Sequence, residues 1–408
     1  NAPHSAMAKG EPRRWSKTSQ DRACVLLAAV LSVASFFRLL RLLSVGGADL
    51  HAATVLAPLG GFLAGALVIL SLVPSPWVQP TYGVEPLLDF ETELDLTLKK
   101  IPLNHFQVVG THNSVHVAGL FSMFIPYWQY THLTLIDQLN LGIRHIELDL
   151  WYNKNIQAWE VWHECVDRLT VTPLMMADVL SQIYTWSKSR QGHFPLTINM
   201  DIKGAYWSYT SYLTPWLLGR GFKDGTPADV QIFQMLEREV LATWSIPDLL
   251  TPASMKFACG EKTMRDAIMN HGWPNVDDLK GKTIFQLNLN GKKAKPLSNA
   301  IKSSTVMFMR GHNYDDPEPE AAWFESNDPE QISSLTQKGY VVRTLDVHAK
   351  AGSNPPKSQY VATNHPASYP LGVLLPLIDA KLNARSRSAS YSSVGDRNLC
   401  TMLEEKNG

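Results

Sequence analysis

Eight short runs of β-branched and aliphatic residues, separated by longer segments, constrain the fold of this chain most strongly. Two intervening segments, residues 175–191 and 229–244, place apolar side chains at the spacing of an amphipathic helix. Strands that alternate with helices predict a parallel α/β fold, and a count of eight favours a (β/α)8 TIM-type barrel over residues 85–380. The runs are FQVVGTHN (106–113), RHIELDLWY (144–152), EVWHE (160–164), PLTINMDIK (195–203), KTIFQLNLN (282–290), STVMFMRG (304–311), GYVVRTLDV (339–347) and QYVATN (359–364).

The composition suits a globular protein whose electrostatics are local. The chain has 408 residues, 45% of them hydrophobic, and Lys plus Arg balance Asp plus Glu at 37 each. A neutral total argues against nucleic acid as a partner, and the sequence identifies no protein partner. Any function that relies on charge is therefore expected to come from a local cluster.

Two apolar runs near the N-terminus predict attachment to a lipid bilayer. A basic polar tail, residues 1–21, precedes a segment (22–78) with candidate helices at 23–45 and 52–73, the second of which is uncharged. About 20 apolar residues span a bilayer as a helix, so the second run fits a transmembrane helix better than the first. The alternatives are a buried core helix, or a signal peptide for the first run, which the second run disfavours.

The side of the membrane on which the domain lies stays open. If both runs cross, the basic tail and the domain lie together on the cytoplasmic side, and if one crosses, the domain lies on the far side. The lack of an Asn-x-Ser/Thr acceptor over residues 80–408 favours the cytoplasmic side. Residues 384–408 are Ser- and Arg-rich and predict a disordered tail. The four cysteines are too scattered for a disulfide framework: Cys24, Cys165, Cys259 and Cys400.

Carboxylates alternate with aliphatic side chains along the second run. In HIELDLW, Glu147 and Asp149 share one face of the strand. Two carboxylates about 7 Å apart on one strand repel each other unless a cation or a proton lies between them. In LTINMDIKG the pattern recurs with Asp201, which favours a metal site over a solvent-facing edge strand, the alternative.

Oxygen donors dominate this predicted metal site. Asn113, after the first run, adds an amide oxygen to the carboxylates of Glu147, Asp149 and Asp201. Calcium accepts such a set in irregular geometry, whereas zinc prefers His and Cys. We therefore expect Ca²⁺, with Mg²⁺ as the alternative.

Two histidines stand at the ends of strand-like runs beside this cluster. His112 closes the first run and His163 closes the third. Imidazoles transfer protons near neutral pH, and a divalent cation neutralises charge that develops on phosphorus. The combination predicts phosphoryl chemistry.

The same residues resemble a known family. GTHNS, QLNLGIRHIELDLW, VWHE and INMDIK are similar to the X region of phosphoinositide-specific phospholipases C, most of all the calcium-dependent group related to microbial enzymes. The likeness extends through LSQIYTWSKSRQGHFPLTINMDIK and GYVVRTLDV, and so covers most of residues 100–370.

The resemblance implies a membrane-associated phosphoric diester hydrolase that acts on a membrane phospholipid. It makes His112 and His163 the catalytic pair, with His163 as general acid, and makes Glu147 a ligand that can also serve as base. Asn113, Glu147, Asp149 and Asp201 become the calcium ligands. The inositol 2-hydroxyl would attack phosphorus, release diacylglycerol and leave a cyclic inositol phosphate. Residues expected to contact substrate are Arg144, Lys203 and Arg343.

Departures from the family pattern leave the substrate open. Gln286 and Asn288 stand where animal enzymes place lysines that hold ring phosphates, so a polyphosphorylated headgroup is disfavoured. Asp201 replaces a glutamate, which shortens the reach of one ligand. The alternatives are a glycerophosphodiester or sphingolipid phosphodiesterase on the same barrel, and a catalytically inactive, membrane-anchored binding module. Glycerophosphodiesterases usually begin with an HRG-type strand, which this chain lacks.

Overall fold

The chain divides into two units, and every residue that the computed structural model describes belongs to one of them. The predicted membrane helices, 23–45 and 52–73, and both predicted tails lie outside the described residues. Among the residues that are described, no helix is both long and apolar enough to cross a bilayer. The described residues are 75, 78, 80, 101–119, 128–163, 167–206, 227–289, 304, 306–345, 356–366 and 373–374.

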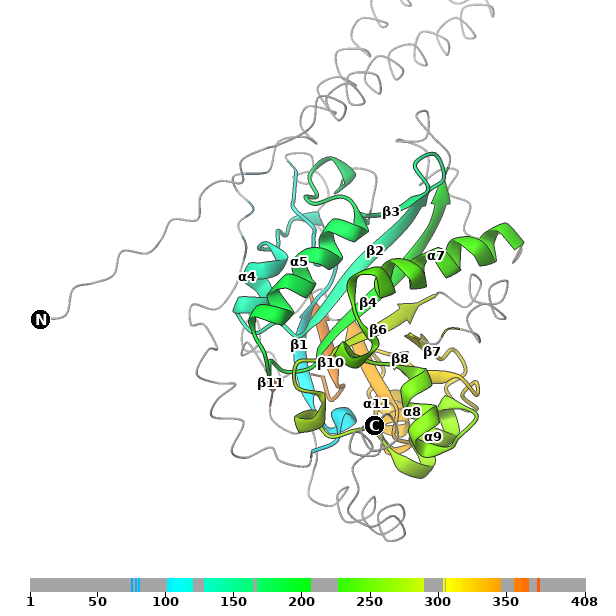
Figure 1. Cartoon of the computed structure of the whole chain (residues 1–408). Helices are drawn as coiled ribbons and strands as arrows, with labels where there is room; N and C mark the ends of the chain where they lie inside the picture. Colours follow the sequence, from blue (N-terminus) through cyan, green and yellow to red (C-terminus); the bar gives the residue numbers. More distant parts are fainter. Residues whose placement is uncertain are drawn as a thin grey trace, which may run out of the picture. The chain divides into compact units, whose positions relative to one another are not determined.

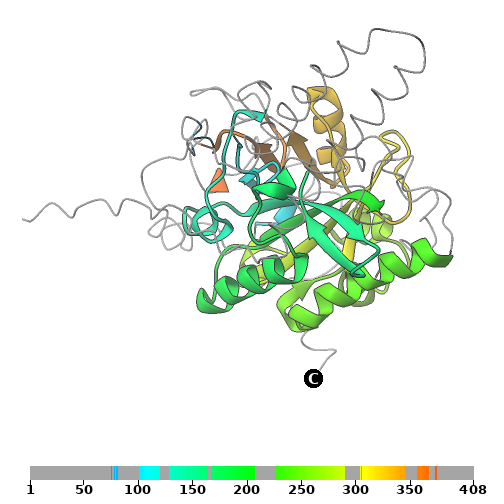
Figure 2. The same cartoon turned by 90° about the horizontal axis from the view of Figure 1, so that it is seen from above.

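Eight parallel strands close into a barrel (Figures 1 and 2). Each strand pairs in parallel with its neighbour in chain order, and the first pairs with both the second and the last, so the ring is complete. The predicted (β/α)8 barrel is confirmed, while its outer boundaries, 85 and 380, stay a prediction. In order around the ring the strands are β1 (Gln107–Thr111), β2 (His145–Asn153), β4 (Leu196–Tyr206), β6 (Thr283–Asn288), β7 (Met307–Arg310), β8 (Ala321–Glu325), β9 (Val341–Leu345) and β10 (Tyr360–Thr363).

The prediction was wrong about one strand and missed another. The run EVWHE contributes to β3 (Ala158–Val161), which pairs antiparallel with β2 outside the ring. Only four residues separate β2 from β3, whereas a parallel crossover needs a dozen or more. The barrel strand that takes its place is β8, whose sequence AAWFE has no polar alternation because the strand is buried on both faces.

Short elements complete the sheet. The strand β5 (Leu249–Leu250) pairs with the start of β6, and β11 (Val373–Leu374) pairs antiparallel with β1. Within the described residues, the 3-10 helix η1 (Leu103–His105) precedes β1, and three others lie in connections: η4 (Asp167–Leu169), η5 (Ile246–Asp248) and η6 (Val276–Leu279).

Helices cover the outside of the barrel (Figure 2). The helices expected within 175–191 and 229–244 are confirmed as α5 (Met176–Ser189) and α7 (Pro227–Thr243). The aliphatic side chains of β2, at positions 146, 148 and 150, are buried in one core cluster with the apolar side chains of α5. The opposite face of β2, with its carboxylates, is therefore left to the lumen. The remaining helices are α4 (Leu135–Asn140), α8 (Pro252–Cys259), α9 (Met264–His271) and α11 (Pro329–Gln337).

A histidine fills the lumen near the N-terminal ends of the strands. The ring of His145 stacks on the ring of Tyr360, with centroids 4.9 Å apart. On β1, the register partner of His145 is Gly110. A Cβ atom added to Gly110 would lie 2.6 Å from the Cβ of His145 and 2.7 Å from its carbonyl oxygen. Glycine is therefore required at this position by close approach.

Gly110→Ala tests this close approach. Because backbone atoms of His145 cannot move aside cheaply, we expect the free energy of unfolding to fall by about 3 kcal/mol or more, measured by urea titration. Gly260→Ala is the control: Gly260 has open space around it and a φ of 72°, so only backbone strain of about 1–2 kcal/mol applies. Equal losses in the two variants would contradict the packing argument.

Candidate active site

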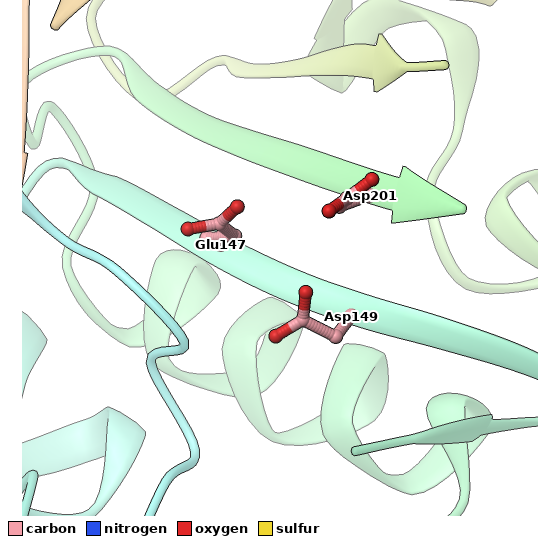
Figure 3. A group of neighbouring side chains, drawn as sticks. All are labelled: Glu147, Asp149 and Asp201. Atoms are coloured by element: carbon pink, nitrogen blue, oxygen red, sulfur yellow. The ribbon is translucent and has the colours of Figure 1, made fainter. Parts of the chain in front are cut away.

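Three carboxylates meet in the lumen near the C-terminal ends of the strands (Figure 3). Glu147 and Asp149 come from alternate positions of β2, and Asp201 is the register partner of Asp149 on β4. One oxygen from each lies within 4.8 Å of the others. The alternation of polar and aliphatic residues in both strands therefore places these groups as predicted.

Asn113 supplies the amide oxygen expected of a fourth ligand. Its φ of 47° turns the chain sharply after β1, and its backbone N–H donates to Oε2 of Glu147 at 3.2 Å. Its Nδ2 donates to the Tyr130 hydroxyl at 2.7 Å, whereas its buried Oδ1 has no hydrogen-bond partner among the described residues. A buried amide oxygen without a donor beside three carboxylates is the arrangement that a hard cation would satisfy.

Hydrogen bonds from Thr111 and Ser114 hold the GTHNS segment against β2 and α4. Ser114 donates its backbone N–H to the carbonyl of Glu147, and its hydroxyl accepts the Glu147 N–H at 2.8 Å. The Thr111 hydroxyl lies 2.6 Å from that of Ser114 and donates to Gln138. These contacts attach the end of β1 to β2, so Asn113 and Glu147 are held as a unit.

Lys203 partly balances the acidic cluster. Its Nζ lies 2.5 Å from Asp201 and 2.9 Å from Asp149. Burial opposes the lysine charge, but the two aspartates outweigh it and raise the pKa of Lys203. Burial likewise raises the pKa values of Glu147 and Asp149, against the lowering effect of Arg343 and Lys203 respectively. A divalent cation would favour the ionised form of both carboxyl groups.

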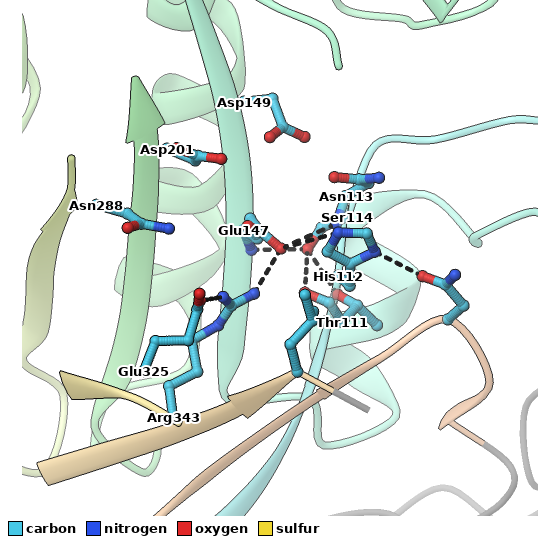
Figure 4. Close-up of polar contacts among 12 residues, drawn as sticks. Thr111, His112, Asn113, Ser114, Glu147, Asp149, Asp201, Asn288, Glu325 and Arg343 are labelled. Carbon is cyan, nitrogen blue, oxygen red and sulfur yellow. Dashed lines mark hydrogen bonds and ion pairs between the residues drawn. The ribbon is translucent and has the colours of Figure 1, made fainter. Parts of the chain in front are cut away.

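Arg343 orients Glu147 from the opposite side of the barrel (Figure 4). Its Nη2 lies 2.6 Å from Oε2 of Glu147, and its Nη1 bonds Glu325 at the end of β8. Glu325 in turn pairs with Arg310 at 3.1 Å, and Arg310 donates to Asn288 at 2.8 Å. A chain of charges therefore crosses the lumen from β2 to β6 and leaves Oε1 of Glu147 outside these ion pairs.

The two predicted catalytic histidines lie edge to face, with ring centroids 6.2 Å apart. His163 lies just past β3, outside the ring, but the hairpin folds back so that Trp162 N–H donates to the carbonyl of Asp149 at 2.9 Å. Burial, assisted by the Lys203 charge, lowers the pKa of His163 to about 4. The imidazole of His163 is therefore neutral at pH 7 in the ligand-free protein.

His112 is held by an amide that the sequence did not single out. Its Nδ1 lies 2.7 Å from Oδ1 of Asn364, just past β10. Because a carbonyl oxygen only accepts, Nδ1 carries the hydrogen and Nε2 keeps its lone pair. That Nε2 lies 4.0 Å from Oε2 of Glu147, on the lumen side of the ring. The tautomer suits His112 to receive a proton.

Arg144 does not reach the site, and the prediction that it contacts substrate was wrong. It precedes β2, at the opposite end of the barrel, and Nη1 donates to the carbonyls of Leu139 and Ile143. Its guanidinium packs 5.0 Å from the Trp186 ring centroid. Arg343 and Lys203 do lie in the lumen, but they bond carboxylates there, so direct contact with substrate stays a prediction for both.

A sequence profile described as "Phosphoinositide phospholipase C, Ca2+-dependent" matches residues 163–358. Residues 163–358 therefore match the calcium-dependent phosphoinositide phospholipase C family. Its members are phosphoric diester hydrolases, so the acidic cluster is suited to calcium in an enzyme of this class. The match begins at His163; His112, Asn113, Glu147 and Asp149 join the site through the geometry above.

One solved structure supports this fold, and a second is similar to a lesser degree. A calcium-dependent phosphoinositol-specific phospholipase C from a Pseudomonas species aligns with a TM-score of 0.50 and 17% identity, over 69% of this chain and 97% of that chain. A calcium-dependent phosphatidylinositol-specific phospholipase C from Streptomyces antibioticus aligns with a TM-score of 0.44 and 16% identity, over 65% and 96%. A comparison with curated proteins found no match.

Three residues of the site were not predicted from the sequence, because the segments that carry them show no motif or periodicity. Tyr130 lies in a connection, Asn364 follows β10, and Glu325 ends the unpredicted strand β8. Their roles come from contacts across 17 positions for Tyr130–Asn113 and 252 positions for Asn364–His112. For Glu325 and Asn364 the sequence offered one indication: polar residues at the C-terminal ends of barrel strands are candidates for the active site.

Asn364→Leu tests the orientation of His112. Without the acceptor at Nδ1 the imidazole loses its fixed tautomer, so we expect kcat for phosphodiester cleavage to fall about 10- to 100-fold while the melting temperature changes little. Asn364→Asp is the conservative comparison, because it retains an acceptor, and its kcat should stay closer to that of the parent. Equal losses in the two variants would contradict the orienting role.

The free energy of unfolding should depend on pH through the buried side chain of His132. Burial lowers the pKa of His132 to about 3, and its Nε2 donates to the carbonyl of His112 at 2.8 Å. Its unfolded pKa is about 6.5, so the unfolded state binds more protons between the two values and stability is lost as pH falls.

We therefore expect the stability advantage of the parent over His132→Gln to shrink by about 2 kcal/mol between pH 7 and pH 5. Urea titrations of both proteins at each pH measure this difference. An advantage that stays constant or grows would show that the folded His132 accepts the proton.

Proposed function

We propose that this chain cleaves a phosphoinositide-type lipid to diacylglycerol and a cyclic inositol phosphate, with calcium bound by Asn113, Glu147, Asp149 and Asp201. The observation that carries the proposal is the convergence of this oxygen set with two imidazoles in one barrel lumen. Calcium would supply charge neutralisation at phosphorus and would acidify a nearby hydroxyl.

The two histidines divide the proton transfers. His112 Nε2 accepts the proton of the inositol 2-hydroxyl as its oxygen bonds to phosphorus, and the bond from phosphorus to the glycerol oxygen breaks. His163 donates a proton to that glycerol oxygen. Since its imidazole is neutral in the ligand-free protein, we infer that His163 takes up this proton when the anionic phosphodiester binds and raises its pKa. Glu147 would be one of the residues that hold calcium, while Arg343 bonds its Oε2.

The charges at the site favour a lipid without ring phosphates. Among the described residues at this site, four carboxylates (Glu147, Asp149, Asp201 and Glu325) face three cations (Lys203, Arg310 and Arg343), and every one of the cations is paired. One divalent cation added to this set would leave a single positive charge, which matches one phosphodiester. Gln286 is buried and uncharged, and Asn288 accepts from Arg310. We therefore propose phosphatidylinositol itself as substrate.

A membrane location fits this substrate. The apolar runs at 23–45 and 52–73 would tether the barrel to a bilayer, with the cytoplasmic face favoured by the lack of glycosylation acceptors. Glycerophosphodiesters, sphingolipids and binding without turnover are the competing proposals, and they differ in which soluble product appears.

The test uses the full chain in mixed vesicles of phosphatidylinositol and phosphatidylcholine, with calcium or with chelator. We expect calcium-dependent release of inositol phosphate, reduced about 10²- to 10⁴-fold in His163→Ala. In Asp201→Asn the lost carboxylate should raise the calcium concentration needed for half-maximal rate. His271→Ala, a histidine on α9 paired with Glu261, is the matched control and should retain full activity.

Parallel vesicles with phosphatidylinositol bisphosphate or sphingomyelin, and soluble glycerophosphoinositol, separate the substrates. Faster release from any of these than from phosphatidylinositol would overturn the substrate assignment. Release that survives both chelator and His163→Ala would overturn the mechanism.

A further inference from the structure

The hydrogen bond between Tyr130 and Asn113 stands outside the reaction chemistry but engages one of the two terminal atoms of the Asn113 amide. An asparagine side chain ends in an oxygen and a nitrogen of nearly equal size, and rotation about its last bond exchanges them. Only the oxygen can bind a cation. The orientation of this amide therefore decides whether the fourth ligand is present.

Near an acidic cluster, a free amide would turn its nitrogen, not its oxygen, toward the carboxylates, which is the orientation that cannot bind a cation. Carboxylates attract the Nδ2 hydrogens, so with no other partner Asn113 would turn its nitrogen toward Glu147 and Asp149. The structure shows the opposite orientation: Nδ2 donates to the Tyr130 hydroxyl at 2.7 Å, and Oδ1 has no partner within the described part of the chain. In this arrangement the Tyr130 oxygen is the acceptor, and as such it competes with the carboxylates for the amide hydrogens.

Tyr130 is rigid enough to hold this orientation. It is 4% exposed, and its ring lies 4.2 Å from the ring of His116 and 5.4 Å from that of His132. His116 is itself held by Asp167 at 2.7 Å and by the carbonyl of Trp128 at 3.3 Å. Burial, with the charge of Asp167, raises the pKa of Tyr130 well above 10, so its hydroxyl stays neutral.

The backbone around Tyr130 is attached to the same turn that carries Asn113. Thr131 forms an antiparallel bridge with Val117, and His132 N–H donates to the carbonyl of His116 at 2.9 Å. The residue next to Asn113 is also reached, since His132 Nε2 donates to the carbonyl of His112. Residues 128–132 therefore form a support behind the turn that carries both a catalytic histidine and a metal ligand.

We propose that Tyr130 is a positioning residue that turns the Asn113 amide oxygen toward the metal site before calcium binds. This inference rests on the proposed calcium site. Groups that orient metal ligands in this way typically contribute 10- to 100-fold to metal affinity. In this proposal the Tyr130 hydroxyl contacts neither metal nor substrate, so its removal should weaken calcium binding. That loss should vanish when Asn113 is replaced by aspartate, whose two terminal atoms are both oxygens.

The experiment measures calcium affinity by isothermal titration calorimetry on the full chain, for the parent, Tyr130→Phe, Asn113→Asp and the double variant. We expect Tyr130→Phe to weaken calcium binding about tenfold. In the Asn113→Asp background, where both terminal atoms are oxygens, the same change should weaken it less than about threefold, because no orientation remains to be selected. At saturating calcium, Tyr130→Phe should recover parental kcat.

Tyr340→Phe is the matched control. Tyr340 is equally buried, but its hydroxyl has no hydrogen-bond partner among the described residues, so calcium affinity should not change. Melting temperatures without calcium show whether Tyr130→Phe also loosens the fold, and the comparison of the two backgrounds remains decisive if it does.

Three outcomes would overturn the proposal. If the parent binds calcium and Tyr130→Phe binds it equally well, Tyr130 does not orient the amide, and the calcium site itself stands. If Tyr130→Phe weakens binding equally in both backgrounds, the hydroxyl acts through the fold. If the parent binds no calcium at all, the proposed function fails together with this inference.

Discussion

The cost of keeping three carboxylates charged in a buried lumen governs the arrangement of this barrel. Glu147 and Asp149 are 3% and 1% exposed, and an unpaired buried charge is expensive. Arg343 and Lys203 offset that cost from β9 and β4, and removal of one partner from such a pair typically costs about 3–5 kcal/mol. The acidic face of β2 is therefore stable because the neighbouring strand β4 and the more distant strand β9 bring cations to it. A divalent cation would relieve the remaining repulsion.

Rigid polar contacts then convert this balance of charges into a site with defined donor atoms. Ser114 connects the end of β1 to Glu147, Asn364 sets the tautomer of His112, and Tyr130 sets the face of Asn113. Each contact stabilises one of two side-chain states, such as the two tautomers of His112 or the two orientations of the Asn113 amide, that would otherwise be close in energy. The chemistry of the family, calcium-assisted cleavage of a phosphodiester, depends on such choices, because a ligand nitrogen or a misplaced proton at one atom disables the site.

The sequence predicted those parts of the fold and site that depend on local periodicity. Alternation in HIELDLW and LTINMDIKG placed the three acidic side chains on one face of two adjacent strands, and the structure brings them within 4.8 Å. It misassigned EVWHE to the ring, although the short connection from the preceding run is below the dozen residues that a parallel crossover needs. It also placed Arg144 in the site, although a residue before a strand lies at the end of the barrel away from the catalytic loops.

By itself, then, the sequence determined the alternation of strands and helices and the acidic faces of β2 and β4, because each depends on neighbours a few positions apart. Only the tertiary structure decided which oxygen of Glu147 Arg343 bonds, which nitrogen of His112 carries its hydrogen, and which atom of Asn113 faces the carboxylates. Those outcomes rest on contacts between segments 17 to 252 positions apart, whose spacing in sequence carries no periodic signal. Closure of the barrel brings these segments together.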